Sequence, residues 1–343
     1  MKHSRENLIL GIETSCDETG AAIVAEGRHI LANVVTSSLK EHSRYGGIIP
    51  EIASRRQMEC IMPVVDSALQ KSGTRLDDLT AIAVTKSPGL IGSLLVGVAF
   101  ARALSYAIHK PLVEVNHIEA HLYANFLVSD TPKDHPVPRL PAVGLVVSGG
   151  HTSLYYIKNF NHIRLIGQKR DDAAGEAYDK VARLMDLGYP GGPVIDRIAQ
   201  NYTKPVRLRF KCADLPDSHD FSFSGIKTAV LYHLQRRSSV SQEDKAEIAV
   251  AFQESVVENL VQKALKACQR KHCRTLLVGG GVAANSALRR RLAEKGKQHQ
   301  VQIHIPPLAL CLDNAAMIAG LGWPVWKNQK NILKNAAFDY NKN

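Results

Sequence analysis

Two histidines four residues apart, His117 and His121, could bind a divalent metal ion. Residues i and i+4 lie on one face of a helix, so both imidazoles can point at the same ion. A zincin protease would need His-Glu-x-x-His, with the glutamate directly after the first histidine. Here the glutamate is Glu119, one place further on, where it leaves the metal-facing side. The spacing favours a metal clamp over a peptidase, although paired histidines are more often ordinary surface or core residues.

Two polar turns follow apolar strands, one near the start of each half of the chain. Residues 8–12 lead into the acidic, hydroxyl-rich turn 13–20, which contains Asp17, and residues 142–147 lead into Ser148-Gly149-Gly150-His151-Thr152. In such turns backbone N–H groups and hydroxyls can face a phosphate, while a carboxylate holds a cation or orients a nucleophile. An ordinary hairpin with a polar turn is the alternative for each copy. The repetition predicts a duplicated fold with a ligand cleft between the copies.

Two later segments could complete such a site. The glycine-rich residues 279–285 follow an apolar strand and would let an adenosine ring or ribose lie against bare backbone. Their spacing is not Gly-x-Gly-x-x-Gly, which disfavours a Rossmann dinucleotide site. Asp313 precedes a predicted helix at 315–321, where an aspartate is by default an N-cap. It could instead be the third ligand that His117 and His121 need.

Apolar periodicity predicts an α/β protein whose strands and helices position these residues. Strands are predicted at 8–12, 21–25, 29–36, 81–85, 112–115, 142–148, 154–157, 275–278 and 301–305. The histidine helix begins at the carboxyl end of strand 112–115, where α/β proteins place their sites. Pro63 should kink or break the helix that starts near Ile52.

The chain is predicted to form two lobes joined by the proline-rich residues 129–141. The first lobe, 8–135, would contain the acidic turn and the two histidines. The second lobe, 140–325, would contain the glycine turn and the glycine-rich loop. Residues 326–343 are predicted to be a basic C-terminal tail.

The overall composition describes an ordinary globular protein with a basic surface. The 343 residues are 45% hydrophobic and 22% charged, and the net charge of +11 favours a polyanionic partner, with nucleic acid first. A solvated positive surface is the alternative. The six cysteines include no Cys-x-x-Cys pair, which indicates a reduced set. No segment reads as a membrane span or a signal peptide, so a cytoplasmic protein is expected.

Several motifs, in order along nearly the whole chain, resemble the tRNA N6-adenosine threonylcarbamoyltransferases, a family formerly called O-sialoglycoprotein endopeptidases. The matching residues are 11–19, 46–54, 116–121, 145–152, 171–180, 189–193, 220–225, 279–285 and 313–319. Each motif is modest, but their joint occurrence is highly specific. The chain looks most like the bacterial branch of the family.

The resemblance implies an actin/sugar-kinase/Hsp70-like fold of two duplicated RNase-H-like lobes. It also implies a reaction: the threonylcarbamoyl group of L-threonylcarbamoyladenylate passes to N6 of the adenosine 3′ of the anticodon, in tRNAs that read ANN codons. The implied metal ligands are His117, His121 and Asp313. Two histidines and a carboxylate with open positions suit one Fe²⁺ or, alternatively, Zn²⁺.

The resemblance also implies which residues bind the adenylate. They are Val146, Val147, Ser148, Gly149, Gly150, Asp179, Gly192, Asp196 and Asn285. We expect the metal to act as a Lewis acid on the threonylcarbamoyl carbonyl, with AMP as leaving group. Asp17 is the expected base for the amine, and His151 could position the carbamoyl or phosphate group.

Three positions depart from patterns found in the family. Ser87 stands where the family usually has glycine in Gly-Pro-Gly-Leu, and Leu312 stands where it usually has threonine in Cys-Thr-Asp-Asn. Neither change removes an implied ligand, so altered detail is expected, with activity retained. Val146 stands where the archaeal and eukaryotic branch can place a metal-binding tyrosine, and valine cannot coordinate.

The resemblance implies companions, and it leaves rival functions to be tested. A paralogous subunit of the same fold and a small P-loop ATPase are expected, with a heterodimer built through the first lobe. The first rival is an ATP-dependent kinase or ATPase on the same fold, which should not need the metal set. The others are a secreted glycoprotease and a non-enzymatic scaffold for tRNA and partner subunits.

Overall fold

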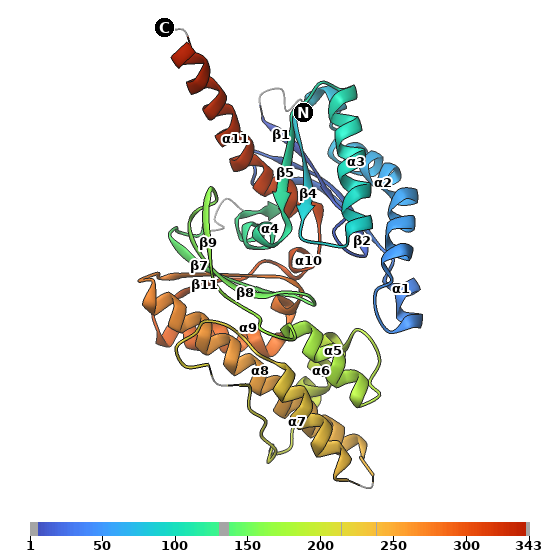
Figure 1. Ribbon diagram of the computed structural model, residues 1–343, viewed down its shortest axis with the longest axis vertical. Coiled ribbons are helices and arrows are strands. Elements are labelled where there is room, and N and C mark those ends of the chain that lie inside the picture. Colours follow the sequence, from blue (N-terminus) through green and yellow to red (C-terminus); the bar gives the residue numbers. More distant parts are fainter. Residues whose placement is uncertain (1–5, 130–136, 214, 238, 341–343) are drawn as a thin grey trace. The chain divides into compact units, whose positions relative to one another are not determined.

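The computed structural model describes residues 6–129, 137–213, 215–237 and 239–340 (Figure 1). The chain divides into two compact units. Unit 1 comprises Met1–Val137 and Leu312–Asn343, and unit 2 comprises Pro138–Cys311. Within the described ranges, no helix is long and apolar enough to cross a membrane.

Unit 1 is built on a six-stranded mixed sheet with the order β5-β4-β1-β2-β3-β6. Its strands are β1 (Leu8–Glu13), β2 (Glu18–Ala25), β3 (His29–Ser37), β4 (Leu79–Ser87), β5 (Leu112–Asn116) and β6 (Val128–Ser129). The central strand β1 runs antiparallel to β2 and parallel to β4. Every residue of β1 is buried, because helices cover both faces of the sheet.

The helices of unit 1 are α1 (Leu39–His42), α2 (Pro50–Ser72), α3 (Ile91–Ala107), α4 (His117–Tyr123) and α11 (Ala315–Tyr340), with short 3₁₀ turns at Ser43–Tyr45, Leu76–Asp78 and Ala124–Phe126. Helix α2 begins with Pro50 in its first turn, where a missing N–H costs no hydrogen bond. It continues across Pro63 as one helix, so the predicted break into two helices is wrong. Proline removes a single i to i−4 hydrogen bond, and the packed face of α2, which includes Ile61 and Val65, keeps the helix together.

The end of the chain belongs to unit 1, so the predicted extent of the second lobe, 140–325, is wrong at its C-terminal end. Helix α11 packs on β1 and β2. The approach is so close that a Cβ on Gly11 would lie 2.3 Å from the carbonyl oxygen of Ala315. The predicted tail 326–343 is likewise not a separate segment, because α11 continues through it to Tyr340 (Figure 1).

Unit 2 repeats the strand arrangement of unit 1 in a five-stranded sheet with the order β11-β10-β7-β8-β9. Its strands are β7 (Ala142–Val147), β8 (Thr152–Asn159), β9 (His162–Gln168), β10 (Thr275–Gly279) and β11 (Gln302–His304). Strand β7 runs antiparallel to β8 and parallel to β10, just as β1 runs antiparallel to β2 and parallel to β4. The predicted duplication of the strand–turn–strand element is therefore confirmed.

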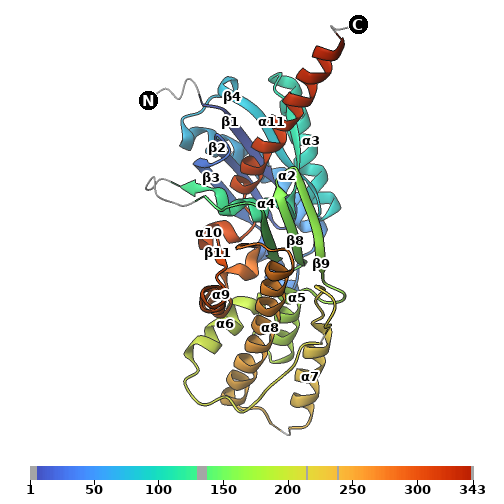
Figure 2. The same ribbon diagram turned by 90° about the vertical axis from the view of Figure 1, so that its left-hand side faces the viewer.

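The core of unit 2 lies between this sheet and a layer of helices (Figure 2). The helices are α5 (Ala174–Leu184), α6 (Gly191–Asn201), α7 (Ser224–Gln235), α8 (Gln242–Arg270), α9 (Ser286–Gln298) and α10 (Leu308–Cys311), with a 3₁₀ turn at Gly281–Ala284. Ser241 caps α8 through a hydrogen bond from Asp244 N. On the inner face of α8, Phe252 and Leu260 are fully buried.

Candidate functional site

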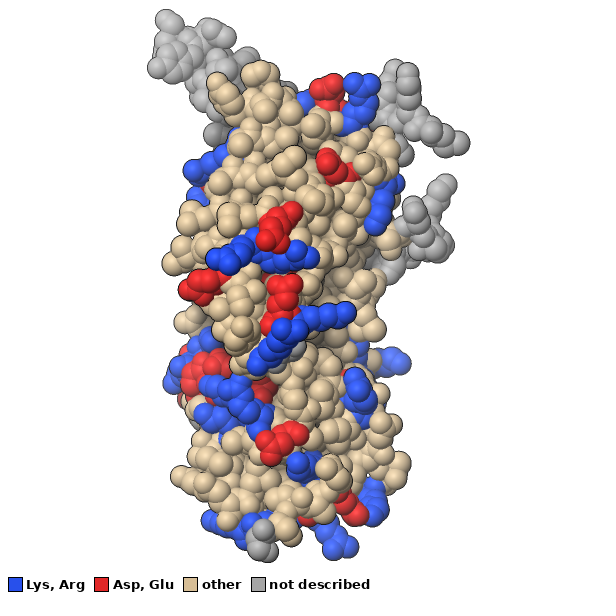
Figure 3. Space-filling model, turned by 90° about the vertical axis from the view of Figure 1, so that its right-hand side faces the viewer, with Lys and Arg blue, Asp and Glu red and all other residues tan. Residues whose placement is uncertain are grey.

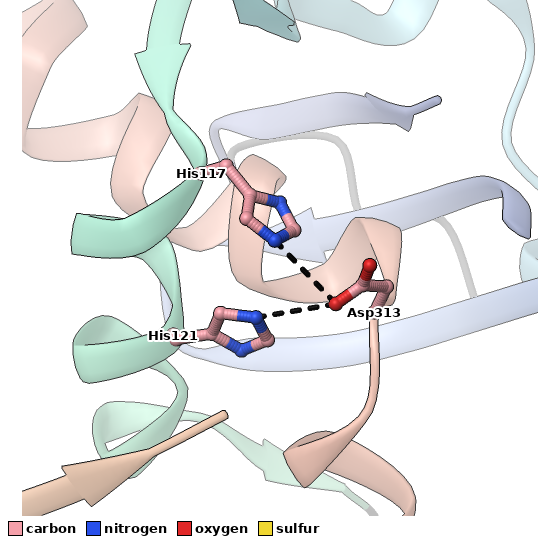
Figure 4. Close-up of side chains that lie close together, drawn as sticks. All are labelled: His117, His121 and Asp313. Carbon is pink, nitrogen blue, oxygen red and sulfur yellow. Dashed lines mark ion pairs between the residues drawn. The ribbon is translucent and has the colours of Figure 1, made fainter. Parts of the chain in front are cut away.

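His117, His121 and Asp313 converge in unit 1 (Figure 4). Oδ1 of Asp313 lies 3.4 Å from Nε2 of His117 and 3.2 Å from Nε2 of His121. The two histidines come from consecutive turns of α4, and the aspartate directly precedes Asn314 and α11. The two histidines lie on the same side of α4, and Asp313, far away in the sequence, joins them.

The start of each helix fixes the direction of these side chains. Asn116 caps α4, since its Oδ1 accepts hydrogen bonds from the N–H groups of Ile118 and Glu119 at 2.9 and 3.2 Å. At the start of α11, the side chain of Asn314 accepts from Met317 N at 3.1 Å. Asn314 is therefore the N-cap, and the carboxylate of Asp313 is left for the two histidines.

A second carboxylate, that of Glu13, contacts the ring nitrogen of His117 that does not face Asp313. It was not predicted from the sequence. It is fully buried at the end of β1, and its Oε2 lies 3.0 Å from Nδ1 of His117. The same oxygen accepts a hydrogen bond from Thr85 Oγ1 at 2.6 Å. Carboxylates commonly hold metal-binding histidines in this way, which fixes the tautomer and the ring orientation. The feature of the sequence that could have revealed this residue is a glutamate at the end of an otherwise apolar strand.

Electrostatics within the cluster separate the two histidines. Burial opposes the charged form of His117, but the carboxylates of Asp313 and Glu13 raise its pKa well above the usual value. Burial lowers the pKa of His121, so its imidazole is neutral at physiological pH. Burial alone would raise the pKa of Asp313, but the two histidines lower it far below its usual range.

The donor set fits a divalent metal. Both ring nitrogens of His121 are buried, and neither makes a hydrogen bond within the described parts of the chain. Ligands bound at 2.0–2.1 Å to a tetrahedral ion lie about 3.4 Å from one another. The two distances from Asp313 to the histidines, 3.2 and 3.4 Å, agree with that separation. A neutral His121 beside an ionised Asp313 has the protonation state that metal binding requires, whereas His117 would release a proton when an ion binds.

Asp17 lies in the turn between β1 and β2 and is largely buried. Ser37 Oγ donates to its carboxylate at 3.3 Å, and Ser38 Oγ donates to its backbone carbonyl at 2.9 Å. Its neighbour Glu18 has a pKa raised to about 10, first by burial and then by the carboxylates of Asp313 and Asp17. The acidic turn therefore lies within electrostatic range of the metal-ligand cluster.

In unit 2, the turn after β7 is tight and leaves its glycines exposed. Ser148 N donates to the carbonyl of His151 at 2.8 Å, and His151 N donates to Ser148 Oγ at 3.1 Å. Gly149 and Gly150 are exposed, with open space where a Cβ would stand. Val146 and Val147, by contrast, are fully buried in β7. If these two valines contact a ligand, as expected from the resemblance, they can do so only through backbone groups.

Asp179, Asp196 and Asn285 all hold the ends of helices in unit 2. Asp179 Oδ1 accepts from Gly191 N at 2.7 Å, at the start of α6. Asp196 accepts from the hydroxyl of Ser286 at 2.7 Å, and Asn285 caps α9 through Leu288 N at 2.9 Å. The structure thus brings Asp196 next to the Asn285-Ser286 pair, whereas Asp179 braces the turn that contains Gly192.

Gln253 of α8 belongs to this group of contacts but was not predicted from the sequence. Its Oε1 accepts a hydrogen bond from Asn285 Nδ2 at 2.7 Å, in the buried interior of unit 2. It also accepts from Tyr178 Oη at 3.5 Å. The feature of the sequence that could have revealed this residue is a glutamine on the inner face of an amphipathic helix.

The departure from the usual family residue at Leu312 has a simple structural outcome. Its side chain is exposed, and only its carbonyl takes part, accepting from Asn314 Nδ2 at 2.8 Å. Any side chain provides that carbonyl.

Ser87 ends β4, and it precedes a turn in which Leu90 N donates to Ser15 O at 2.8 Å. The polar turn after β1 is therefore supported by a backbone contact that does not involve the side chain of Ser87.

Comparison with solved structures confirms the expected fold. The chain resembles HypF from T. kodakarensis with a TM-score of 0.61 at 12% identity, covering 95% of this chain and 48% of that one. It resembles component A of the Acidaminococcus fermentans (R)-2-hydroxyglutaryl-CoA dehydratase with a TM-score of 0.52 at 16% identity, covering 93% and 97%. These neighbours belong to the actin/sugar-kinase/Hsp70-like fold, as expected from the motifs.

Sequence comparisons supply the family. Residues 29–320 match the family model of tRNA N6-adenosine threonylcarbamoyltransferase. The enzyme of that name from Symbiobacterium thermophilum is 47% identical over 95% of this chain and 94% of its own length. The one from Moorella thermoacetica is 50% identical over 91% and 90%. A transferase is thereby identified in place of the kinase-like alternative, and the chain belongs to the tRNA N6-adenosine threonylcarbamoyltransferase family.

Proposed function

We propose that the family's reaction, transfer of a threonylcarbamoyl group to N6 of adenosine in tRNA, depends in this protein on a metal held by His117, His121 and Asp313. The observation that carries the proposal is the convergence of two histidine Nε2 atoms on one carboxylate oxygen. We propose Fe²⁺ as the ion and Zn²⁺ as the alternative. Both ions accept two imidazoles and a carboxylate with positions left open. When bound, it supplies Lewis-acid polarisation of the threonylcarbamoyl carbonyl.

The surrounding residues keep this ligand set ready for the ion. Glu13 holds Nδ1 of His117, which leaves Nε2 for coordination. Asn314 takes over the capping of α11, which spares Asp313 that task. Burial keeps His121 neutral, so its lone pair is available.

Asp17 is proposed as the base for the attacking amine. The N6 amine must lose a proton as its bond to the carbonyl carbon forms and AMP leaves with the electrons of the broken bond. A carboxylate held by Ser37 at the polar turn, close to the metal ligands, suits that role. Burial and the nearby carboxylates raise the pKa of its neighbour Glu18, which keeps Glu18 protonated and unsuited to take up the proton.

The adenylate is proposed to bind to unit 2. The exposed backbone of Gly149 and Gly150 is open to a phosphate or carbamoyl group, with His151 beside it. Gly192 also faces open space. Asp179, Asp196 and Asn285 would fix the loops that receive the adenosine, through the helix-end contacts described above.

We also propose that a paralogous subunit of the same fold binds to unit 1. Met58 and Met62 lie one turn apart on α2, and Ile91 and Leu95 lie one turn apart on α3; all four are more than 60% exposed. Helices α2 and α3 pack together. Exposed apolar side chains at this spacing form a helical face suited to another protein. A small P-loop ATPase is the other proposed companion.

The first experiment is transfer of labelled threonylcarbamoyl from its adenylate to unmodified tRNA. The purified protein with its companions is compared with His117→Ala, and metal content is measured in both. We expect the wild type to transfer the group and the variant to lose both metal and transfer. Equal transfer by the two proteins would refute the metal's role and leave the reaction standing. Met62→Glu, tested by co-purification with the paralogue, examines the docking face separately.

A further inference from the structure

The segment between α6 and α7 carries a row of exposed basic side chains. From 206 to 212, exposed residues alternate with residues packed against the core of unit 2. The packed residues are Val206, Leu208, Phe210 and Cys212. A period of two is that of extended backbone, so Arg207, Arg209 and Lys211 all project from the outward side. We call these three residues the basic row.

Specific contacts hold this segment along α8 (Figure 2). Glu247 Oε1 accepts from the N–H groups of Arg207 and Leu208 at 2.7 and 3.1 Å. Ser255 Oγ, two helical turns further along, donates to the carbonyl of Phe210 at 2.8 Å. The ring of Phe210 also packs edge-on against His233 of α7, with centroids 6.0 Å apart. The segment that carries the basic row is therefore held in place by α7 and α8.

The charges of the basic row are not neutralised by the fold. Lys204, just before it, pairs with Glu243 at 2.7 Å. Arg207, Arg209 and Lys211 make no ion pair with any residue that the structure describes. Alternate residues of extended backbone are about 6.6 Å apart. That spacing is shorter than the Debye length of about 8 Å at physiological salt, so the three cations repel one another and their potentials add.

The neighbouring end of α7 adds further positive charge. Arg236 and Arg237 follow directly after this helix, one turn beyond His233, and both are exposed. Arg237 pairs with Asp244, whereas Arg236 has no such partner among the described residues. On the molecular face drawn in Figure 3, basic and acidic side chains are intermixed.

We propose that the basic row binds the sugar–phosphate backbone of tRNA. The proposal rests on tRNA being the substrate, which family membership supplies. Closely spaced, unpaired cations on a rigid segment cost self-repulsion in the free protein, and a polyanion removes that cost. Contacts of this kind position a nucleic acid without reading its sequence, so they suit an enzyme that acts on many tRNAs.

The test is a charge reversal of the whole row, Arg207→Glu/Arg209→Glu/Lys211→Glu, in the full-length protein. Binding to unmodified tRNA is measured by fluorescence anisotropy across a salt series. Each lost phosphate contact reduces the slope of log K against log salt by about 0.9, so we expect the slope to fall by about 2 to 3. We also expect at least a tenfold higher KM for tRNA in the transfer assay, with an unchanged KM for the adenylate. The corresponding alanine variant should show the same salt effect more weakly.

The matched control is Lys158→Glu/Arg164→Glu/Lys297→Glu. It reverses three charges that are equally exposed on unit 2, and that also have no ion pair in the described structure. Circular dichroism and thermal unfolding check that both variants fold. If the row variant matches this control in salt slope and in KM for tRNA, the proposal is overturned. If the wild type itself transfers nothing to tRNA, the reaction and this proposal fail together.

Discussion

Glu13 Oε2 lies 3.0 Å from Nδ1 of His117, although the two residues are 104 positions apart in the sequence. The contact joins the end of β1 to the start of α4 and directs Nε2 of the histidine at Asp313. It makes the buried strand a part of the proposed metal site.

Replacement of Glu13 by glutamine should weaken metal binding without removing a ligand. Loss of the partner carboxylate lowers the basicity of His117 and frees its ring orientation, which typically costs 10- to 100-fold in affinity. Titration of the metal-free protein with Fe²⁺ or Zn²⁺ measures the change. Glu114→Gln is the control, because Glu114 pairs with Lys86 and Arg102 at the surface. Equal affinities for the two variants would contradict the role given to Glu13.

Asp17→Asn should reduce kcat while leaving metal content and the KM for the adenylate near their wild-type values. The amide keeps the shape and the contact with Ser37 but cannot take up a proton. A general base typically contributes 10²- to 10⁴-fold. Single-turnover transfer to tRNA measures the chemical step. A variant with unchanged kcat would show that another group removes the proton.

Gly11→Ala should destabilise unit 1, because the new Cβ would lie 2.3 Å from Ala315 O and 2.8 Å from Ala319 Cβ. Forcing α11 away from β1 is expected to cost about 1–3 kcal/mol in the free energy of unfolding. Urea unfolding followed by circular dichroism reports the change. Gly47→Ala, where a Cβ meets nothing within 4 Å, should stay close to the wild type. Equal losses in both variants would argue against the close crossing.

Asp171→Asn should lower stability at neutral pH but not in strong acid. Partial burial would raise the pKa of Asp171, but hydrogen bonds from Ser222, Phe223 and Ser224 outweigh it and lower the pKa. A carboxylate with a lowered pKa stabilises the fold above the unfolded-state pKa of about 4, and the effect is lost as the pH falls through the folded-state value.

Because Asp171 holds the start of α7, as an N-cap would, the expected loss at pH 7 is about 1 kcal/mol. Thermal unfolding of wild type and variant between pH 2 and pH 7 measures it. A difference that persists undiminished at the lowest pH would show that the carboxylate charge is not the cause.

The positions of the two histidines and of the two repeated turns could be predicted because local rules determine them. The i, i+4 spacing of His117 and His121, and the strand–turn–strand pattern around Asp17 and Ser148, follow from periods of 3.6 and 2 residues. The strand pairing confirmed the duplication, and the family comparisons confirmed the reaction that the motifs imply.

Capping roles at the helix ends could not be assigned from sequence alone. Asp313 and Asn314 are both good N-cap residues, and only the hydrogen bond from Met317 shows that Asn314 takes the role. Likewise, Asp179 and Asp196 accept hydrogen bonds from the ends of helices α6 and α9, which begin elsewhere in the sequence. Local propensity permits each of these residues to cap, but the three-dimensional arrangement chooses among them.

The sequence by itself determined the two repeated turns, the two histidines and the family. Only the tertiary structure decided that α11 returns to unit 1, that Asp313 thereby meets His117 and His121, and that Glu13 supports them. The physical reason is that these contacts depend on packing between distant segments. The absence of a side chain at Gly11 lets α11 lie directly on β1, and no local period in the sequence records that contact.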